Sequence, residues 1–82
     1  MDSVRPSLED FTAHFAAQLE ETDAALIAPE TEFRQLAEWS SMQSLIVIAS
    51  FDWEYGVTMS AEEMKSARTV ADLYAIVKPK IA

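Results

Sequence analysis

Apolar residues recur at intervals of three and four near the start of the chain, which is the spacing of one helical face. Ser7 stands where an N-cap is expected, and Asp10 follows three residues later as a weak capping box. We therefore expect a first helix that begins after Ser7 and ends near residues 21–23. Its apolar face comprises Leu8, Phe11, Phe15, Ala16 and Leu19.

Residues 24–39 contain Pro29 and the polar run 30–32, and they predict a long loop. Loops of this length are uncommon inside compact domains and are often functional. A short helical turn fits residues 32–37. Four apolar side chains are expected to anchor the loop on the core: Leu26, Ile27, Phe33 and Leu36.

A second helix is expected from about Ser41 to Tyr55. Ser40 and Gln43 fit a capping box at its start, and Gly56 fits the left-handed residue that ends a helix. A β-branched run inside this segment is typical of strands, but the length and both caps favour a helix.

The two sides of this second helix are expected to differ in burial. The buried stripe is expected to be Leu45, Ile48, Phe51 (or Asp52) and Tyr55, with Val47 at its edge. The exposed side would then read Gln43, Ile46, Ala49, Asp52 and Trp53.

Two more capping boxes predict two more helices. Ser60 and Glu63 open a short third helix that runs through about Ala67, and Thr69 caps a fourth helix with Asp72 three residues later. The buried stripe of the fourth helix is expected to comprise Val70, Leu73, Tyr74 and Val77.

Pro79 is expected to end the fourth helix. The pattern as a whole predicts an all-α fold over residues 1–82, as a single domain. We expect a small four-helix bundle with a long loop between helices one and two and a short third helix.

The formal net charge is −8, and acidic residues dominate the first three quarters of the chain. Only Arg5 and Arg34 are basic before Glu63, and four basic residues follow it: Lys65, Arg68, Lys78 and Lys80. Such a surface repels nucleic acid and anionic membranes and attracts basic protein patches, although solubility alone is the other interpretation.

No targeting or membrane-spanning segment is expected from the sequence. Residues 1–6 have no apolar targeting region, and the longest apolar run, 45–49, is far shorter than the roughly 20 residues that span a bilayer. The chain has no Cys, which excludes disulfides, thiolate metal sites and a Cys nucleophile. These features suit a cytoplasmic protein.

The sequence contains no catalytic constellation of its own, so we expect a protein that is not an enzyme. The single His, His14, lies among Ala residues and is expected at the surface or half-buried. A small serine esterase would need His14 close to Ser40 or Ser41, and nothing in the pattern requires that approach. Glu62 and Glu63 are adjacent, so they point to different sides of a helix and form no carboxylate pair.

Several short patterns occur in order along the chain. Phe33 and Leu36 are apolar positions in the loop, and the run 39–42, Trp-Ser-Ser-Met, leads into the second helix. The run 55–57, Tyr-Gly-Val, closes that helix, and the run 69–73, Thr-Val-Ala-Asp-Leu, opens the last one. In order and separation these patterns resemble the acyl carrier proteins, which are acidic four-helix domains of about this size.

The resemblance implies that Ser41 carries a 4′-phosphopantetheine arm through a phosphodiester. The thiol of that arm would hold an acyl or aminoacyl group as a thioester. The implied partners are a phosphopantetheinyl transferase and acyl-activating, synthase or transferase enzymes of a fatty-acid, polyketide or related pathway. The resemblance also implies a monomer.

The chain departs from the family pattern at two positions beside Ser41. Ser40 stands where the family has Asp, so it can still cap the helix but supplies no negative charge to a modifying transferase. Met42 replaces Leu and is a mild change, because both side chains are apolar and similar in volume.

One side of the second helix is a candidate partner-binding surface. It comprises Met42, Ile46, Ala49, Asp52 and Trp53, which are mostly apolar where carrier proteins usually show acidic residues. If these side chains are exposed, we expect docking by shape and apolar contact more than by salt. Two alternatives stay open. The long loop or the third helix could cover Ile46 and Trp53, and the chain could be an unmodified, degenerate carrier fold that acts as an acidic protein-interaction module.

Overall fold

The computed structural model describes residues 6–81 and confirms a small all-α fold. The expected lack of a targeting region in residues 1–5 lies outside the described residues. The α-helices are α1 (Leu8–Ala17), α2 (Ser41–Tyr55), α3 (Ala61–Ser66) and α4 (Val70–Val77). Short 3-10 helices occupy Ala24–Leu26 (η1), Phe33–Gln35 (η2) and Lys78–Lys80 (η3).

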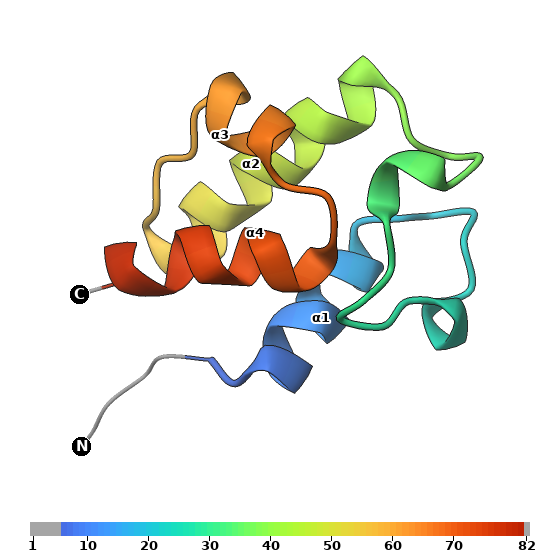
Figure 1. Cartoon of the computed structure of the whole chain (residues 1–82), viewed down its shortest axis with the longest axis horizontal. Helices are drawn as coiled ribbons and strands as arrows, with labels where there is room; N and C mark the ends of the chain where they lie inside the picture. The colour runs from blue at the N-terminus through green and yellow to red at the C-terminus, as the bar shows by residue number, and fades with distance from the viewer. Residues whose placement is uncertain (1–5, 82) are drawn as a thin grey trace.

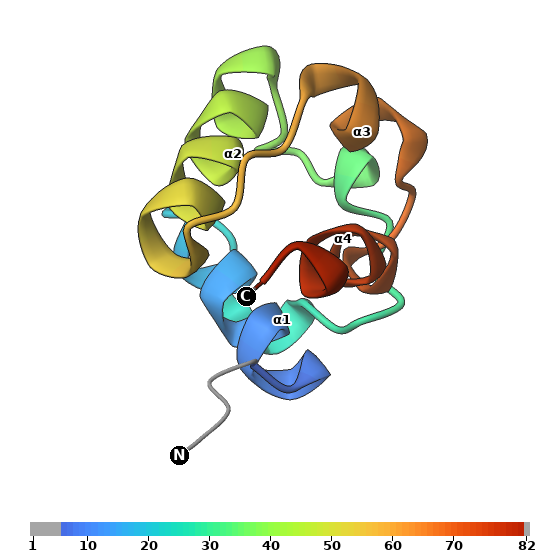
Figure 2. The ribbon, with the colours of Figure 1, turned by 90° about the vertical axis from the view of Figure 1, so that its left-hand side faces the viewer.

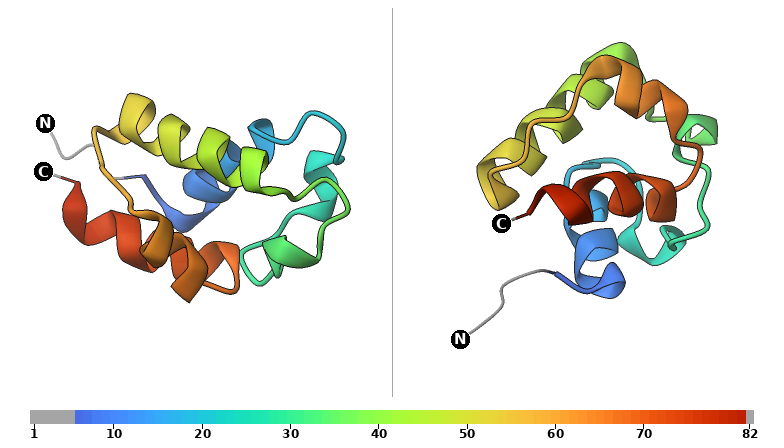
Figure 3. Two further views of the ribbon diagram at one scale, coloured as in Figure 1. Left: turned by 90° about the horizontal axis from the view of Figure 1, so that it is seen from above. Right: turned by 60° about the vertical axis from the view of Figure 1, so that its left-hand side comes forward.

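The four α-helices surround one apolar centre (Figure 2). Helix α1 packs against α4, and the loop between α1 and α2 lies at one end of the bundle, beside the start of α2 (Figures 1 and 3). The centre contains four fully buried phenylalanines, and Phe11 stacks on Phe51 with 5.1 Å between the ring centroids. Val70, Leu73 and Val77 of α4 are fully buried as predicted, whereas Tyr74 is half-buried.

Helix α1 ends at Ala17, earlier than the expected 21–23. The cause is a carboxylate from the far end of the loop. Glu38 accepts hydrogen bonds from the N–H groups of Glu20 and Glu21, at 2.8 and 3.1 Å, and from the Thr22 hydroxyl at 2.7 Å. These bonds take the place of the helical partners of that segment, which therefore lies outside the helix.

Three of the four predicted loop anchors contact the core. Ile27 and Phe33 are buried and Leu36 is partly buried against the core, but the prediction for Leu26 is wrong because that side chain is 69% exposed. Asp23 caps the η1 turn by accepting from Ala25 N–H at 3.0 Å, and this turn directs Ile27 rather than Leu26 inward. The predicted turn near residues 32–37 is present as η2.

Helix α2 has the predicted limits but is rotated from the predicted orientation. Leu45, expected to be buried, is 59% exposed, and Asp52 is also exposed. Gln43, expected on the exposed side, is buried, and Val47 lies at the centre of the buried face rather than at its edge. The buried line of α2 is Gln43, Val47, Ser50 and Phe51, with Ile48 and Tyr55 partly buried beside it.

The four α-helices begin at the predicted N-caps, but the predicted capping box at Ser40 is incomplete because the Gln43 side chain donates to the Gln18 carbonyl instead. Helices α3 and α4 carry complete capping boxes at Ser60 and Thr69, and Gly56 ends α2 in the left-handed conformation with φ 67°. Helix α4 ends at Val77, and Pro79 lies in η3 directly after it. Across residues 6–81, none of the helices has the length and apolar character that a membrane crossing requires.

Candidate functional site

The start of α2 places three serine hydroxyls in different roles. Ser40 is the N-cap in an extended conformation, and its Oγ accepts from Gln43 N–H at 3.1 Å. Ser44 donates from Oγ to the Ser41 carbonyl at 2.7 Å, so both of these hydroxyls are engaged in holding the first turn. Ser41 is the first helical residue and is exposed. Of the three hydroxyls, the one on Ser41 is therefore best placed to react.

The electrostatics at Ser41 favour a negative group. The helix is 15 residues long and has no acidic residue in its first turn, so its positive end is not neutralised by a side chain. Ser40 supplies partners for the N–H groups of Gln43 and Ser44, whereas the first two helical N–H groups point out of the helix start. A phosphate on Ser41 would lie beside these donors.

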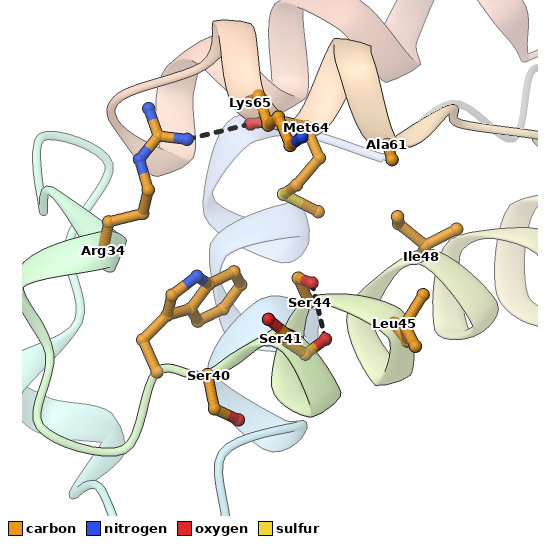
Figure 4. Close-up of a pocket in the computed structure, with 10 residues that line it drawn as sticks. Arg34, Ser40, Ser41, Ser44, Leu45, Ile48, Ala61, Met64 and Lys65 are labelled. Carbon is orange, nitrogen blue, oxygen red and sulfur yellow. Dashed lines mark hydrogen bonds between the residues drawn. The ribbon is translucent and has the colours of Figure 1, made fainter.

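Ser41 borders a hollow of about 270 Å³ between α2 and α3. Figure 4 shows Ser41 and Ser44 at the α2 side of this space, with Met64 of α3 opposite and Leu45 and Ile48 further along α2. Arg34 from η2 and Lys65 from α3 also line it, so an apolar space has cationic groups at its boundary.

Trp39, directly before the serines, forms part of the same hollow and also anchors the loop. Its ring lies 4.8 Å from the Phe33 ring and 6.0 Å from the Phe15 ring, measured between centroids. Because both phenylalanines are fully buried, Trp39 fixes the segment that leads into α2.

The predicted partner surface is exposed on α2. Trp53 is 91% exposed, Met42 67% and Ile46 43%, and Ala49 and Asp52 are exposed as well. Neither the loop nor α3 covers Ile46 or Trp53, so the alternative that these segments bury the two side chains is wrong. A second hollow, of about 330 Å³, lies between Ile46, Ala49 and Trp53 of this surface and Gln18 at the end of α1.

His14 is half-buried, as predicted, and its partner is Ser50 rather than Ser40 or Ser41. The distance from His14 Nε2 to Ser50 Oγ is 3.2 Å, and Ser50 donates its own hydroxyl proton to the Val47 carbonyl at 2.7 Å. Burial lowers the pKa of His14, and the opposing influences are the Glu54 charge and hydrogen bonding at Ser50. This pair is a packing contact between α1 and α2 that leaves Ser50 without a free nucleophilic hydroxyl.

In the part of the chain that the structure describes, no group of three His, Asp or Glu side chains lies close enough together to hold a metal ion.

The sequence interpretation also missed residues that line the hollow beside Ser41. Ser44, Arg34 and Lys65 all line the hollow beside Ser41, but they come from three separate segments. For Ser44, its place three residues after Ser41 is a sequence signal, because that spacing lies on one helical side. For Arg34 and Lys65 no local signal exists.

Comparison with known proteins finds no match: no protein-family model matches the chain, and no similar curated protein or solved structure is found.

Proposed function

We propose that this chain is an acyl carrier protein. It carries an acyl or aminoacyl group as a thioester on a 4′-phosphopantetheine arm attached to Ser41, and it presents that group to the enzymes of a fatty-acid, polyketide or related biosynthetic pathway. The observation that carries the proposal is the position of Ser41, an exposed hydroxyl at the positive end of α2 beside an apolar hollow.

The residues around Ser41 fit such a group. The helix start favours the phosphate of the arm, and the hydroxyl of Ser41 is accessible to a transferase. When bound, the arm supplies the thiol that this chain lacks, since the sequence contains no Cys. Leu45, Ile48 and Met64 provide an apolar lining next to the attachment point. Catalysis would belong to the partner enzymes, and the tether would raise the local concentration of the bound group at their sites.

The exposed side of α2 is the surface that we propose for those partners. Met42, Ile46, Ala49 and Trp53 form an apolar stripe with Asp52 beside it, and an exposed Trp is the kind of side chain that dominates binding interfaces. Docking would therefore depend on apolar contact more than on ion pairs. The partners include a phosphopantetheinyl transferase and acyl-activating, synthase or transferase enzymes, all met by a monomer in the cytoplasm.

A second candidate is an unmodified carrier fold that acts as an acidic protein-interaction module. Ser40 favours it, because the N-cap here supplies no negative charge for a modifying enzyme to recognise. The exposed stripe with Trp53 suits this candidate equally. It predicts a stable stoichiometric complex that Ser41→Ala leaves unchanged.

The experiment that separates the two is intact-protein mass spectrometry of the purified chain. The mass is measured after expression and again after incubation with coenzyme A and a broad-specificity phosphopantetheinyl transferase. The variants are Ser41→Ala, Ser44→Ala as a matched control in the same helical turn, and Ser40→Asp, which restores the charge of the family pattern. Peptide mapping then locates the added group.

We expect one phosphopantetheine on the wild-type chain, on Ser44→Ala and on Ser40→Asp, and none on Ser41→Ala. Faster loading of Ser40→Asp would show that the missing charge slows the transferase. A group found on Ser40 or Ser44 would contradict the assignment of Ser41. Lack of loading in both the wild type and Ser40→Asp, with helical circular dichroism intact, would overturn the carrier proposal in favour of the interaction module.

A further inference from the structure

Arg34 connects two segments that lie far apart in the sequence. Its guanidinium donates from Nη1 to the Met64 carbonyl at 3.3 Å and from Nη2 to the Ala67 carbonyl. Figure 4 shows Arg34 reaching from η2 across to the end of α3. The loop before the Ser41 site is thereby tied to the helix that forms the far wall of the hollow.

The two carbonyls lie at the C-terminal end of α3. The Met64 carbonyl also accepts the capping bond from the Ala67 N–H at 3.3 Å, so Arg34 is its second donor. Helix α3 ends at Ser66, and Ala67 is its C-cap residue. Carbonyl groups at a helix C-terminus need donors from elsewhere, and the negative end of the helix dipole favours a cation there. The planar fork of an arginine directs donors on two separate nitrogens at these two carbonyls, whereas a lysine carries all its donors on one nitrogen.

The loop side of this connection is anchored in the core. Phe33, the neighbour of Arg34, is fully buried, and its ring lies 5.8 Å from the Phe15 ring. The guanidinium carbon of Arg34 lies 5.4 Å from the centroid of the Phe33 ring. Arg34 therefore reaches the end of α3 from a segment that is packed into the core.

Helix α3 depends on such contacts because it has only six residues. A helix this short is not stable by itself in water. Its first turn is held by the Ser60–Glu63 capping box and by an ion pair with Lys80. The distance from Lys80 Nζ to Glu63 Oε2 is 2.8 Å. Arg34 holds the opposite end, so the two ends of α3 have separate attachments.

We propose that Arg34 is a positioning residue that sets the width of the hollow beside Ser41 by holding the C-terminal end of α3. Ala61, Met64 and Lys65 line that hollow from α3, so a displacement of α3 moves one of its walls. The role in positioning α3 stands independently of the proposed function. The consequence that Arg34 controls the protection of a group bound at Ser41 rests on the proposed carrier function.

The first test is hydrogen–deuterium exchange on the chain without any arm. Arg34→Met keeps the length of the side chain and removes its donors. Arg68→Met is the matched control, because Arg68 is also an arginine next to this region but is 73% exposed and pairs with Glu32 at 3.5 Å. Arg34→Lys keeps the charge and loses the fork.

We expect the hydrogen-bonded amides of residues 63–67 to exchange roughly tenfold faster in Arg34→Met, which corresponds to the loss of charge-assisted hydrogen bonds. Arg34→Lys should give a smaller increase, and Arg68→Met should match the wild type. Exchange in α3 of Arg34→Met that equals the wild type would overturn the proposal. An equal increase throughout the chain would also overturn it, because Arg34 would then support the whole fold rather than α3.

The second test uses protein that a transferase has loaded from octanoyl-coenzyme A. Hydroxylamine cleavage of the octanoyl thioester should be several-fold faster in Arg34→Met than in the wild type and in Arg68→Met, because the displaced wall protects the thioester less. Equal cleavage rates would overturn the role in protection. If the wild type accepts no arm, the carrier function fails, while the exchange experiment still decides the position of α3.

Discussion

The side-chain amide of Gln43 donates a hydrogen bond to the main-chain carbonyl of Gln18 at 3.0 Å. This bond joins the first turn of α2 to the residue that caps the end of α1. Gln43 is 7% exposed, so a polar side chain is buried at the point where the two helices meet. The bond also satisfies a carbonyl that the end of α1 would otherwise leave without a helical partner.

Gln43→Ala should therefore lower the free energy of unfolding by about 1–3 kcal/mol, because it removes the donor and leaves a cavity beside the carbonyl. Gln35→Ala, at an exposed position in the loop, is the control and should stay within about 0.5 kcal/mol of the wild type. Urea denaturation followed by circular dichroism measures both. Equal stability of the two variants would show that the Gln43 bond contributes nothing.

The half-buried His14 predicts a pH dependence. Its pKa is lowered from 6.5 mainly by burial, so the unfolded chain binds the proton more readily than the folded chain. The contribution of His14 to stability is then complete above pH 6.5 and decreases as the pH falls through 6.5 toward the lower folded pKa. Glu38 and Asp72 have lowered pKa values, so their contribution to stability is lost only below about pH 4.5. They therefore do not affect a comparison made above pH 5.

Urea denaturation of the wild type and of His14→Gln at pH 7.5 and pH 5.5 tests this. The wild type should lose more stability between the two values than the variant does, because the variant lacks the single imidazole of the sequence. The same pH difference in both proteins would rule out His14 as the cause.

The sequence predicts the helix starts well because an N-cap is a local contact. Spacing alone predicts four N-caps, and each accepts a hydrogen bond from the N–H three residues later: Ser7, Ser40, Ser60 and Thr69. The place of Ser41 at the start of α2 follows from the same reasoning, so the central residue of the candidate site could be predicted.

The rotation of α2 could not be predicted in this way, because the helix is apolar on both sides. Its orientation depends on two polar residues whose partners come from α1. Gln43 pairs with Gln18, 25 positions away, and Ser50 pairs with His14, 36 positions away. The hydrogen bonds of Arg34 also join residues far apart in the sequence, because Met64 is 30 positions away and Ala67 is 33 positions away. A periodicity argument places Gln43 on the exposed side and Leu45 in the buried stripe, which is the opposite of their burial in the structure.

The two tryptophans should respond differently to truncation. Trp53 is 91% exposed, so Trp53→Ala should change the free energy of unfolding by less than about 0.5 kcal/mol. Trp39 packs on Phe33 and Phe15, so Trp39→Ala should lower it by about 2 kcal/mol or more. Urea denaturation measures both changes. A large loss in Trp53→Ala would mean that its exposed ring supports the fold rather than being free for a partner.

Trp53 should matter instead for partner recognition, given the carrier function. In transferase assays, Trp53→Ala should raise the KM for the carrier more than Asp52→Asn does, because apolar contact dominates the exposed side of α2. Raising the salt concentration should change the wild-type KM little. A larger effect of Asp52→Asn, together with strong salt dependence, would show that ion pairs dominate docking.

Gly56 ends α2 with φ 67° and ψ 28°, and its N–H donates to the Asp52 carbonyl at 2.8 Å. A Cβ placed on Gly56 would meet no heavy atom within 4 Å, so a substitution there tests backbone conformation free of any steric contact. Gly56→Ala should lower the free energy of unfolding by about 1–2 kcal/mol, which is the strain of a left-handed L-residue. Gly56→Asn should lose less, because Asn tolerates this conformation better. Urea denaturation ranks the three proteins, and an Ala variant as stable as the wild type would show that the helix end relaxes into another conformation.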